Sequence, residues 1–483
     1  MHLHFIGVGG TAMGSVAIAC SKAGHRVTGS DTALYPPMST VLAEAGIDWY
    51  EGYDADRLAA LQPDLTVVGN AISRGNAELE RILNDRRPMT SMAELIGRLF
   101  IDRNTSIVVT GTHGKTTTSS ITAWLLESAG REPGFMIGGV PGNFTTGCRP
   151  VSGELHDTDR GIFVTEGDEY DTAFFDKRSK FVHYRPTIAI INNIEFDHAD
   201  IFADLAAIIR SFEQMIRIVP MNGVVIPNAD DANAMAAASK STAPVEPVGF
   251  ADGAYWRITD VVYDVDASHW TMLRNGVLHG RFTVAMPGEH SVRNCAAAIA
   301  ATAHAGLGAE EQATGLATVH LPKRRLERIA TWRGATVIDD FAHHPTAIAA
   351  TIGALRQQYP GARILACFEP RSNTTTRSFF QHELAACFDG ATAVCIGPVN
   401  RPERYAVEER LDTNRLVTDL AALGIAAVSL DSTLASDPQW GHYAEEFLGS
   451  HVREGDVVVL LSNGNVGGLR AMLSHPSPSS VIA

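Results

Sequence analysis

Short apolar runs alternate along this chain with longer, helix-sized stretches. Many of the runs are continuously hydrophobic, which is typical of strands buried on both faces of a parallel sheet. Because a helix-sized stretch separates most neighbouring runs, the pattern predicts an α/β protein with parallel sheets. The predicted strands cover residues 4–8, 26–29, 65–68, 106–110, 161–165, 187–192, 223–226, 336–339, 364–368, 393–396, 426–430 and 456–461.

The segment from Trp256 to Met286 departs from this pattern. Polar and apolar residues alternate there over short distances, and Asn275 followed by Gly276 is typical of a tight hairpin turn. We therefore expect a small antiparallel β insert in this segment. The tail at residues 475–480 is rich in proline and serine, and we expect it to fray.

The length and the charge balance narrow the class of protein. A chain of 483 residues has room for about three domains. Hydrophobic residues make up 45% and charged residues 19%, which excludes a charge-rich disordered chain. The 39 basic and 54 acidic residues give a net charge of −15. This balance disfavours broad binding to nucleic acid or an anionic membrane, but it allows a local basic pocket.

Targeting signals and cysteine pairs are not expected in this chain. It contains no run of about 18 apolar residues, the length that a membrane span requires. Met1 to Gly10 lacks the basic region of a signal peptide. The six cysteines, at positions 20, 148, 295, 367, 387 and 395, form no CxxC pair. We expect free, buried thiols in a protein of the reducing cytoplasm.

The strongest chemical signal is the sequence Thr110-Gly-Thr-His-Gly-Lys-Thr-Thr117. It follows a predicted strand and precedes a helical stretch over 118–130, which is the setting of a phosphate-binding loop. Lys115 would reach the β- and γ-phosphates, and the Thr116 hydroxyl would bind Mg²⁺. The usual longer pattern has glycine where this chain has Val109, so the loop is a shorter variant. The alternative is a chance Gly-Lys-Thr turn.

A second glycine-rich turn lies at the start of the chain. Gly7, Gly9, Gly10 and Gly14 follow the first predicted strand, and Asp31 follows the second. The arrangement resembles a dinucleotide fingerprint, in which the acid binds a ribose. Its glycine spacing departs from that fingerprint. A site for another nucleoside diphosphate and a plain tight βα turn remain as alternatives.

Acidic residues follow the predicted strand 161–165. Glu166, Asp168 and Glu169 lie where carboxylates beside a phosphate loop hold Mg²⁺, and a solvated acidic loop is the alternative. His198 follows the next predicted strand and is a candidate ligand of a second divalent ion, or a structural histidine.

Two further polar segments begin helical stretches. The segments 287–294 and 339–346 place polar groups where an anion or a nucleotide edge can bind. Either segment alone would also serve as a helix cap.

In the order in which they occur, these motifs resemble those of the Mur ligases, the ATP-dependent amide-forming enzymes of peptidoglycan assembly. The resemblance covers essentially the whole chain and includes Arg324-Arg-Leu-Glu327. It implies an N-terminal Rossmann-like domain, a central P-loop ATPase-like domain with the antiparallel insert, and a C-terminal Rossmann-like domain. The implied domains are 1–102 for the UDP-sugar, 103–322 for ATP and 323–483 for the peptide.

Within the family, several stretches resemble the branch that joins UDP-N-acetylmuramate to the tripeptide L-alanyl-γ-D-glutamyl-meso-diaminopimelate in murein recycling. They include 35–39, 69–76, 138–144, 169–184 and 369–374. The first alternative is the sibling reaction with L-alanine as acceptor. More distant alternatives are an NAD-dependent oxidoreductase and a non-catalytic nucleotide-gated binding protein.

The resemblance also implies roles for individual residues, with ATP and Mg²⁺ as cofactors. The implied catalytic residues are Lys115, His198, Arg325 and His343. The implied ATP-binding residues are Gly111, Thr112, His113, Gly114, Lys115, Thr116, Thr117, Asn294, Arg325 and Asp340. The implied metal ligands are Thr116, Glu166 and His198. The implied UDP-sugar contacts are Gly7, Gly9, Gly10 and Asp31, and the implied peptide contacts are Arg371, Asn373 and Asn463. Ser291 stands where the family often has asparagine.

Overall fold

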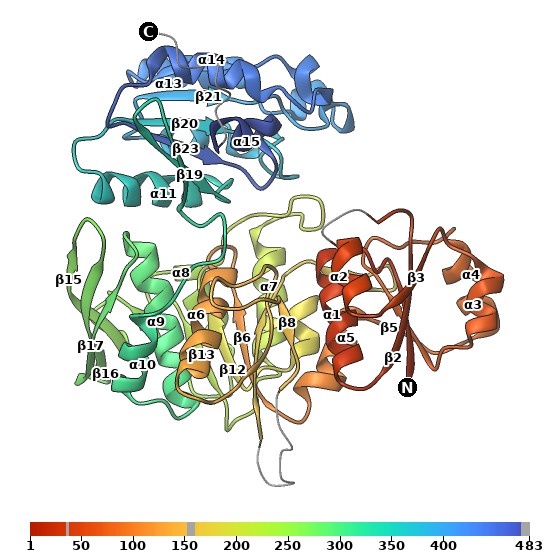
Figure 1. The fold of residues 1–483 in the computed structure, drawn as a ribbon. Coiled ribbons are helices and arrows are strands. Elements are labelled where there is room, and N and C mark those ends of the chain that lie inside the picture. The colour runs from red at the N-terminus through yellow and green to blue at the C-terminus, as the bar shows by residue number, and fades with distance from the viewer. Residues whose placement is uncertain (35–37, 152–159, 475–483) are drawn as a thin grey trace.

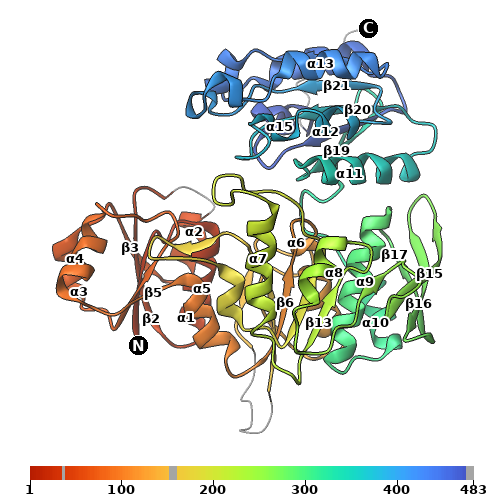
Figure 2. The same cartoon turned by 180° about the vertical axis from the view of Figure 1, so that it is seen from behind.

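The computed structural model describes residues 1–34, 38–151 and 160–474. Its three main sheets have five, six and six strands and follow one another along the chain. We refer to the elements around them as the N-terminal, central and C-terminal domains. The C-terminal domain lies over the central domain, and the N-terminal domain lies to one side (Figures 1 and 2). The predicted fraying of 475–480 and the stretch 35–37 of the 35–39 resemblance fall outside the described residues.

The N-terminal sheet is entirely parallel, with the order β3-β2-β1-β4-β5. Its strands are β1 (His2–Ile6), β2 (Arg26–Asp31), β3 (Asp48–Glu51), β4 (Leu65–Val68) and β5 (Met89–Ser91). Its helices are α1 (Thr11–Lys22), α2 (Met38–Glu44), α3 (Ala55–Leu61), α4 (Ala77–Asp85), α5 (Met92–Ile96) and the π-helix η1 (Gly97–Ile101).

The prediction of a strand over 4–8 is wrong at both ends. Strand β1 begins at His2 and ends at Ile6, because Gly7 has φ of 86° and turns the chain. The amides of Gly7 and Val8 both donate to the Ser30 carbonyl. The glycine turn therefore starts two residues earlier than the apolar pattern suggests.

The central sheet has the order β13-β12-β6-β9-β7-β8 and is parallel except at β8. Its strands are β6 (Thr105–Thr110), β7 (Gly134–Met136), β8 (Cys148–Arg149), β9 (Ile162–Glu166), β12 (Ile188–Ile191) and β13 (Val224–Pro227). The hairpin β10 (Asp171–Ala173) and β11 (Asp176–Ser179) and the 3-10 helix η2 (Lys180–Tyr184) lie between β9 and β12. The helices are α6 (Lys115–Ser128), α7 (Leu205–Ile216), α8 (Ala232–Ala238), α9 (Glu289–His304) and α10 (Ala309–Leu316).

The antiparallel insert is confirmed. Strands β15 (Trp256–Tyr263), β16 (Ser268–Arg274) and β17 (Val277–Val284) form successive antiparallel pairs. Asn275 and Gly276 have φ of 48° and 78°, the left-handed values that their hairpin turn requires. The short strand β14 (Val248–Gly249) adds to β15 in parallel. The insert lies at the far edge of the central domain from the N-terminal domain (Figure 1).

The C-terminal sheet has the order β18-β19-β23-β20-β21-β22. Its strands are β18 (Glu327–Trp332), β19 (Ala335–Asp340), β20 (Ile364–Phe368), β21 (Ala393–Ile396), β22 (Ala426–Ser429) and β23 (Val457–Leu461). Its α-helices are α11 (Pro345–Gln358), α12 (Glu383–Ala386), α13 (Thr413–Ala422), α14 (Gly441–His451) and α15 (Leu469–Ser474), with short 3-10 helices at 378–380, 402–404, 407–409, 432–436 and 466–468. Only the edge strand β18 pairs antiparallel among these described strands.

The apolar core links two of the domains and leaves the third separate. One cluster joins the N-terminal helix α1, through Val16 and Cys20, to central residues such as Phe163 and Phe181. The C-terminal domain packs its sheet into two clusters drawn from its own residues. The six cysteines are free and buried, as predicted. Within 1–34, 38–151 and 160–474, no helix has the length and hydropathy to cross a membrane.

A buried polar group lies inside the N-terminal domain. Glu78, on α4, is 0% exposed and accepts from the Ser30 hydroxyl at 2.6 Å, the Tyr50 hydroxyl at 2.5 Å and the Asp54 amide at 3.0 Å. The His4 ring lies 3.6 Å away. We expect Glu78→Ala to lower the free energy of unfolding by about 3 kcal/mol, because its partners would be buried without an acceptor. Chemical denaturation of the whole chain measures this change.

Glu44, an exposed glutamate at the end of α2 in the same domain, supplies the control: Glu44→Ala should change stability by less than about 0.5 kcal/mol. Burial alone would raise the pKa of Glu78, but the hydrogen bonds from His4, Ser30, Tyr50 and Asp54 outweigh it and lower the pKa. The stabilisation is therefore complete above the ordinary glutamate pKa and is lost as the pH falls through the lowered value. Equal losses for both variants, or an unchanged acid profile for Glu78→Ala, would contradict this interpretation.

Candidate active site

The phosphate-type loop lies between β6 and α6. Helix α6 begins at Lys115, three residues earlier than predicted, and Gly114 caps it with φ of 80°. A Cβ atom at Gly114 would lie 2.6 Å from Asn294 Oδ1 and 2.9 Å from Asn192 Nδ2. The loop backbone therefore approaches the neighbouring segments more closely than any side chain would allow. Its amides at the start of α6 form a cradle that suits phosphate oxygens.

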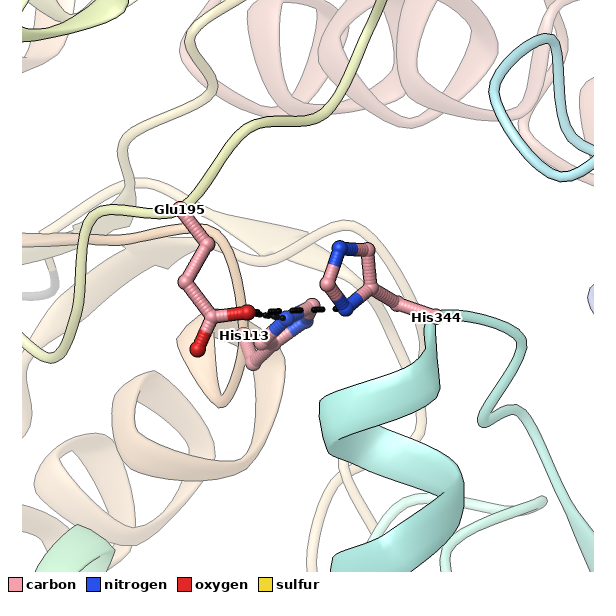
Figure 3. A group of neighbouring side chains, drawn as sticks. All are labelled: His113, Glu195 and His344. Atoms are coloured by element: carbon pink, nitrogen blue, oxygen red, sulfur yellow. Dashed lines mark hydrogen bonds and ion pairs between the residues drawn. The ribbon is translucent and has the colours of Figure 1, made fainter. Parts of the chain in front are cut away.

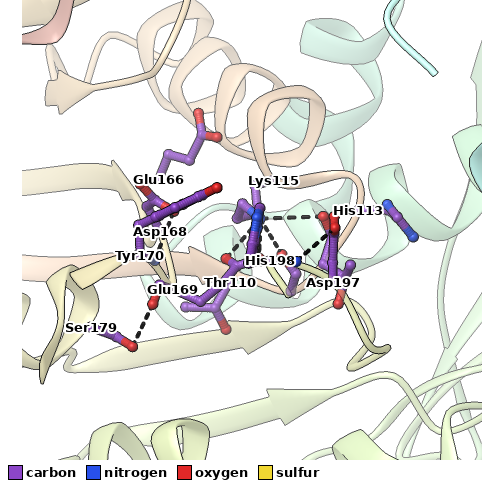
Figure 4. A network of polar contacts seen from close by, with 12 residues as sticks. Thr110, His113, Lys115, Glu166, Asp168, Glu169, Tyr170, Ser179, Asp197 and His198 are labelled. Atoms are coloured by element: carbon purple, nitrogen blue, oxygen red, sulfur yellow. Dashed lines mark hydrogen bonds and ion pairs between the residues drawn. The ribbon is translucent and has the colours of Figure 1, made fainter. Parts of the chain in front are cut away.

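Lys115 is anchored beneath this cradle. Its Nζ donates to Gly111 O at 2.5 Å and to Glu169 Oε2 at 2.9 Å, and Glu169 is only 2% exposed. Burial alone would lower the pKa of Lys115, but the carboxylates of Glu169 and Asp168 outweigh it and raise the pKa. The ammonium group is thus held in its charged form. Figure 4 shows this group of polar side chains.

The acidic residues at the end of β9 and just beyond it contact different partners. The Thr116 hydroxyl donates to Glu166 Oε1 at 3.0 Å, and the Gly138 amide donates to Oε2 at 2.9 Å. Asp168 accepts from Lys180 Nζ at 2.6 Å. The Thr116 and Glu166 oxygens lie side by side, and oxygen atoms are the ligands that Mg²⁺ prefers. Glu169 instead pairs with Lys115, a role that its place in the acidic run did not reveal.

His198 lies at the edge of the same group, in the loop after β12. Its Nε2 is 3.1 Å from Glu169 Oε1, and its backbone has φ of 54°, which is uncommon for a residue other than glycine. Burial opposes the charged ring, but the hydrogen bond and charge of Glu169 outweigh it and raise the pKa of His198. The structure therefore joins Lys115, Glu169 and His198 in one chain of polar contacts.

A cavity of about 890 Å³ opens beside the loop and takes its lining from all three domains. Ala12 and Met92 contribute from the N-terminal domain, and Ala354 contributes from α11. The predicted residues that line the cavity are Thr112, His113, Gly114, Lys115, Thr116, Thr117, Glu166, His198, Asn294, Arg325, Asp340 and His343. Residues more than 200 positions apart in the sequence thus meet around one space.

Asn294 and Ser291 occupy the first turns of α9. Asn294 Oδ1 accepts from the Thr118 hydroxyl at 3.1 Å, so the side chain lies directly against α6. The Ser291 hydroxyl donates to the Pro287 carbonyl at 2.8 Å, and Ser291 is 3% exposed. The serine at this departure from the family pattern therefore stabilises the turn that begins the helix.

The residues around β19 face the cavity from the C-terminal domain. Asp340 accepts from the amides of Leu326 at 2.7 Å and Ala342 at 2.8 Å, so its carboxylate fixes the two chain segments around it. The Arg325 guanidinium lies 5.1 Å from the centre of the Phe341 ring. Burial lowers the pKa of His343, whose Nδ1 lies 3.0 Å from the Phe341 carbonyl.

The predicted UDP-sugar residues lie elsewhere, at the carboxyl edge of the N-terminal sheet. Asp31 Oδ2 accepts from the Gly9 amide at 2.7 Å, and Oδ1 accepts from the Thr32 amide at 2.7 Å. Its carboxylate therefore fastens the glycine turn of Gly7, Gly9 and Gly10. These residues lie outside the lining of the large cavity.

The predicted peptide contacts lie at the carboxyl ends of the C-terminal strands. Arg371 Nη1 donates to Glu369 Oε1 at 3.3 Å. Asn463 Oδ1 is buried and has no hydrogen-bond partner among the residues that the structure describes. Asn373 lies against the Tyr170 hydroxyl of the central domain. Arg371 and Asn463 thus belong to one strand edge, whereas Asn373 lies at the junction of two domains.

The loop after β12 holds the C-terminal domain through residues that sequence reasoning did not single out. The Thr374 hydroxyl donates to Asp197 at 2.6 Å, and the Thr346 hydroxyl donates to Glu195 at 2.6 Å. Asp197 is 5% exposed. Both acids lie within three residues of His198, which the sequence did single out, but the sequence does not show their partners.

Three nucleotide-type α/β domains around one phosphate-loop cavity define an ATP-using enzyme of the multidomain ligase type. Models of the Mur ligase family, catalytic domain, the Mur ligase middle domain and the Mur ligase, glutamate ligase domain match residues 2–103, 109–302 and 324–464. The chain belongs to the Mur ligase family.

Individual relatives cover nearly the whole chain. It is 40% identical to the UDP-N-acetylmuramate–L-alanyl-gamma-D-glutamyl-meso-2,6-diaminoheptandioate ligase of Escherichia coli (strain K12), over 98% of this chain and 97% of that protein. It is 30% identical to the UDP-N-acetylmuramate–L-alanine ligase of Rhizobium etli, over 98% and 96%. The crystal structure of a murein peptide ligase from Psychrobacter arcticus 273-4 matches with a TM-score of 0.70 and 33% identity, over 100% of both chains.

Proposed function

We propose that this protein is an ATP-dependent ligase that joins the carboxylate of UDP-N-acetylmuramate to the amino group of L-alanyl-γ-D-glutamyl-meso-diaminopimelate. The observation that carries the proposal is the cavity beside Lys115, because its lining brings phosphate-loop, acidic and C-terminal residues together. The choice of the tripeptide is supported by the E. coli relative, which is more similar than the relative named for L-alanine.

The chemistry requires two anions to meet. The muramoyl carboxylate attacks the γ-phosphorus of ATP, ADP leaves, and the peptide amine then displaces phosphate from the acyl phosphate. At about 4 Å, two unit charges repel by about 4 kcal/mol at an effective dielectric of about 20. The charged Lys115 offsets this repulsion from the floor of the loop. Bound Mg²⁺, held by Thr116 and Glu166, would neutralise phosphate charge.

The remaining roles follow the three domains. We assign 1–102 to the UDP-sugar, with Gly7, Gly9 and Gly10 at the diphosphate and Asp31 fixing their turn. We assign 103–322 to ATP and 323–483 to the peptide. Within the cavity, we assign Asn294 to the adenine edge, Asp340 to the ribose, Arg325 to the phosphates and His343 to the vicinity of the transferred group. At the peptide site, we assign Arg371, Asn373 and Asn463 to the polar groups of the acceptor.

The acceptor comparison tests the proposal. Purified protein is given ATP, Mg²⁺ and UDP-N-acetylmuramate, with either the tripeptide or L-alanine, and phosphate release and product mass are measured. We expect phosphate release coupled to amide product with the tripeptide. If phosphate were released with L-alanine and not with the tripeptide, L-alanine would be the acceptor. If NAD raised the melting temperature of the protein and the UDP-sugar did not, an oxidoreductase would be favoured.

His198→Ala is expected to raise the Mg²⁺ concentration for half-maximal ligation by about 10-fold. The change removes the ring that lies 3.1 Å from Glu169, and with it a candidate ligand of a second Mg²⁺. A magnesium titration of phosphate release measures the effect. His304→Ala removes a histidine paired with Glu246 at 2.8 Å on the surface of α9, and it should leave the titration unchanged. An unchanged titration for His198→Ala would give His198 a structural role only.

A further inference from the structure

A cluster of three metal-type ligands lies where the phosphate loop meets the C-terminal domain. His113 belongs to the loop, Glu195 follows β12, and His344 caps α11. One ligand atom from each lies within 4.8 Å of the other two. His113 Nε2 and His344 Nδ1 lie 3.4 Å and 3.5 Å from the same oxygen, Glu195 Oε2. Figure 3 shows both rings turned toward this carboxylate.

These separations suit a small tetrahedral ion. With bonds of about 2.0 to 2.1 Å, two ligands of a tetrahedral Zn²⁺ ion lie about 3.3 Å apart. Two imidazoles and one carboxylate are a common ligand set for Zn²⁺ and leave one position open. All three residues line the cavity, so that position would face the space beside the loop.

The surroundings of His344 prepare its Nδ1 to bind a cation. His344 is 4% exposed, and burial lowers its pKa, so the ring is neutral at neutral pH. Its Nε2 lies 3.3 Å from the Phe196 carbonyl. A proton on Nε2 donates to that carbonyl and leaves Nδ1 unprotonated. The Nδ1 lone pair accepts from the Thr346 amide at 3.3 Å, and a bound cation would replace this hydrogen bond. Metal-binding histidines are oriented by contacts of this kind.

The cluster differs chemically from the pair Thr116 and Glu166, which we assign to the first Mg²⁺ ion. Thr116 and Glu166 offer only oxygen atoms, which suit Mg²⁺, whereas His113 and His344 offer two nitrogen atoms. Imidazole ligands favour Zn²⁺ and related transition metals over Mg²⁺. A transition-metal ion would therefore select this cluster in the presence of magnesium.

We propose that His113, Glu195 and His344 form a binding site for a Zn²⁺-class ion, which fastens the C-terminal domain to the phosphate loop. The ligands come from two domains that do not share an apolar cluster among the described core residues. The ion binds only the arrangement in which the domains meet, so it favours that arrangement by mass action. If the protein is the ligase proposed above, a bound ion inhibits turnover, because it slows the opening of the C-terminal domain.

Cobalt absorption tests the site without using catalysis. Full-length protein in excess Mg²⁺, without nucleotide, is titrated with Co²⁺, and the visible bands of tetrahedral cobalt are recorded before and after adding Zn²⁺. We expect one Co²⁺ per chain, displaced by Zn²⁺. Both His344→Gln and His113→Gln should weaken binding at least about 10-fold. His269→Gln removes an exposed histidine 3.0 Å from Asp264 and should bind as the unchanged protein does.

Further readouts separate a failed site from a failed fold or function. Circular dichroism shows whether His344→Gln, which alters the cap of α11, still folds; His113→Gln leaves that cap intact. Hydrogen exchange at the start of α11 should slow on adding Zn²⁺ to the unchanged protein and not to His113→Gln. The absence of tetrahedral bands, binding unaffected by His113→Gln, or bands of cysteine-bound cobalt would overturn the site. Ligation that proceeds unchanged with Zn²⁺ bound would overturn the inhibition alone.

Discussion

Lys115→Ala is expected to lower the ligation rate by about 10³-fold while binding of UDP-N-acetylmuramate survives. Lys115 is the cation at the floor of the phosphate loop, and its charge is sustained by Glu169. The predicted UDP-sugar residues lie in another domain, against a separate sheet edge. Phosphate release measures the first expectation, and titration calorimetry with the UDP-sugar measures the second.

Lys115→Ala leaves the buried Glu169 without its ammonium partner, so a loss of activity could come from the missing charge or from a disturbed structure. The double variant Lys115→Ala with Glu169→Gln removes that unpaired charge and should remain equally inactive. Lys177→Ala removes an exposed lysine paired with Asp171 at 2.5 Å and should be fully active. Simultaneous loss of UDP-sugar binding in the folded double variant would show that the two sites are not separate.

Glu166→Gln is expected to lower the ligation rate at limiting Mg²⁺ by about 100-fold. The substitution keeps the shape of the side chain, and an amide oxygen still accepts from the Gly138 amide. It removes the negative charge beside Thr116, which the proposed ion requires. Initial rates across a magnesium series measure the loss, which should shrink as Mg²⁺ approaches saturation.

Glu127→Gln is the matched control for this variant. Glu127 lies at the other end of α6 and pairs with Arg149 through both carboxylate oxygens. Its neutralisation should leave the magnesium dependence unchanged. If Glu166→Gln kept the magnesium response of the unchanged protein, Glu166 would only support the loop through Thr116 and Gly138.

The sequence predicted the long buried strands and the insert because their signals are local. The run 106–110 is continuously apolar apart from its ends, and the Asn275–Gly276 turn uses residues that tolerate positive φ. The short strands β7 and β8 were missed, since two or three residues cannot display a period. The edge strand β18 was missed as well, and half of its residues are only partly buried.

The sequence predicted the motifs of the candidate site, but it did not predict which side chains in them contact one another. The run from Glu166 to Glu169 indicated a carboxylate site, yet only the fold shows that Thr116 contacts Glu166 whereas Lys115 contacts Glu169. Contacts between Asp197 and Thr374 span 177 positions. Such pairs depend on how the domains meet, which no local pattern in a single sequence reports.

The apolar core indicates which domains move together and which domain moves separately. The N-terminal and central domains share one apolar cluster, so the regions that we propose for the UDP-sugar and for ATP should move together. The C-terminal domain meets the central loop through polar contacts of Glu195 and Asp197 and one edge-to-face ring contact, between Phe196 and Phe379. Polar contacts of this kind exchange readily with water, so the C-terminal domain is the part expected to open and close.

Oxygen transfer provides the most direct measurement of the central claim, the activation of a sugar-borne carboxylate by the γ-phosphate of ATP. UDP-N-acetylmuramate carrying ¹⁸O in both carboxylate oxygens is incubated with ATP, Mg²⁺, the tripeptide and the protein, and the released phosphate is analysed by mass spectrometry. The account predicts one ¹⁸O atom in each phosphate and the other in the new amide. Unlabelled phosphate accompanying amide product, or label recovered in AMP, would contradict it.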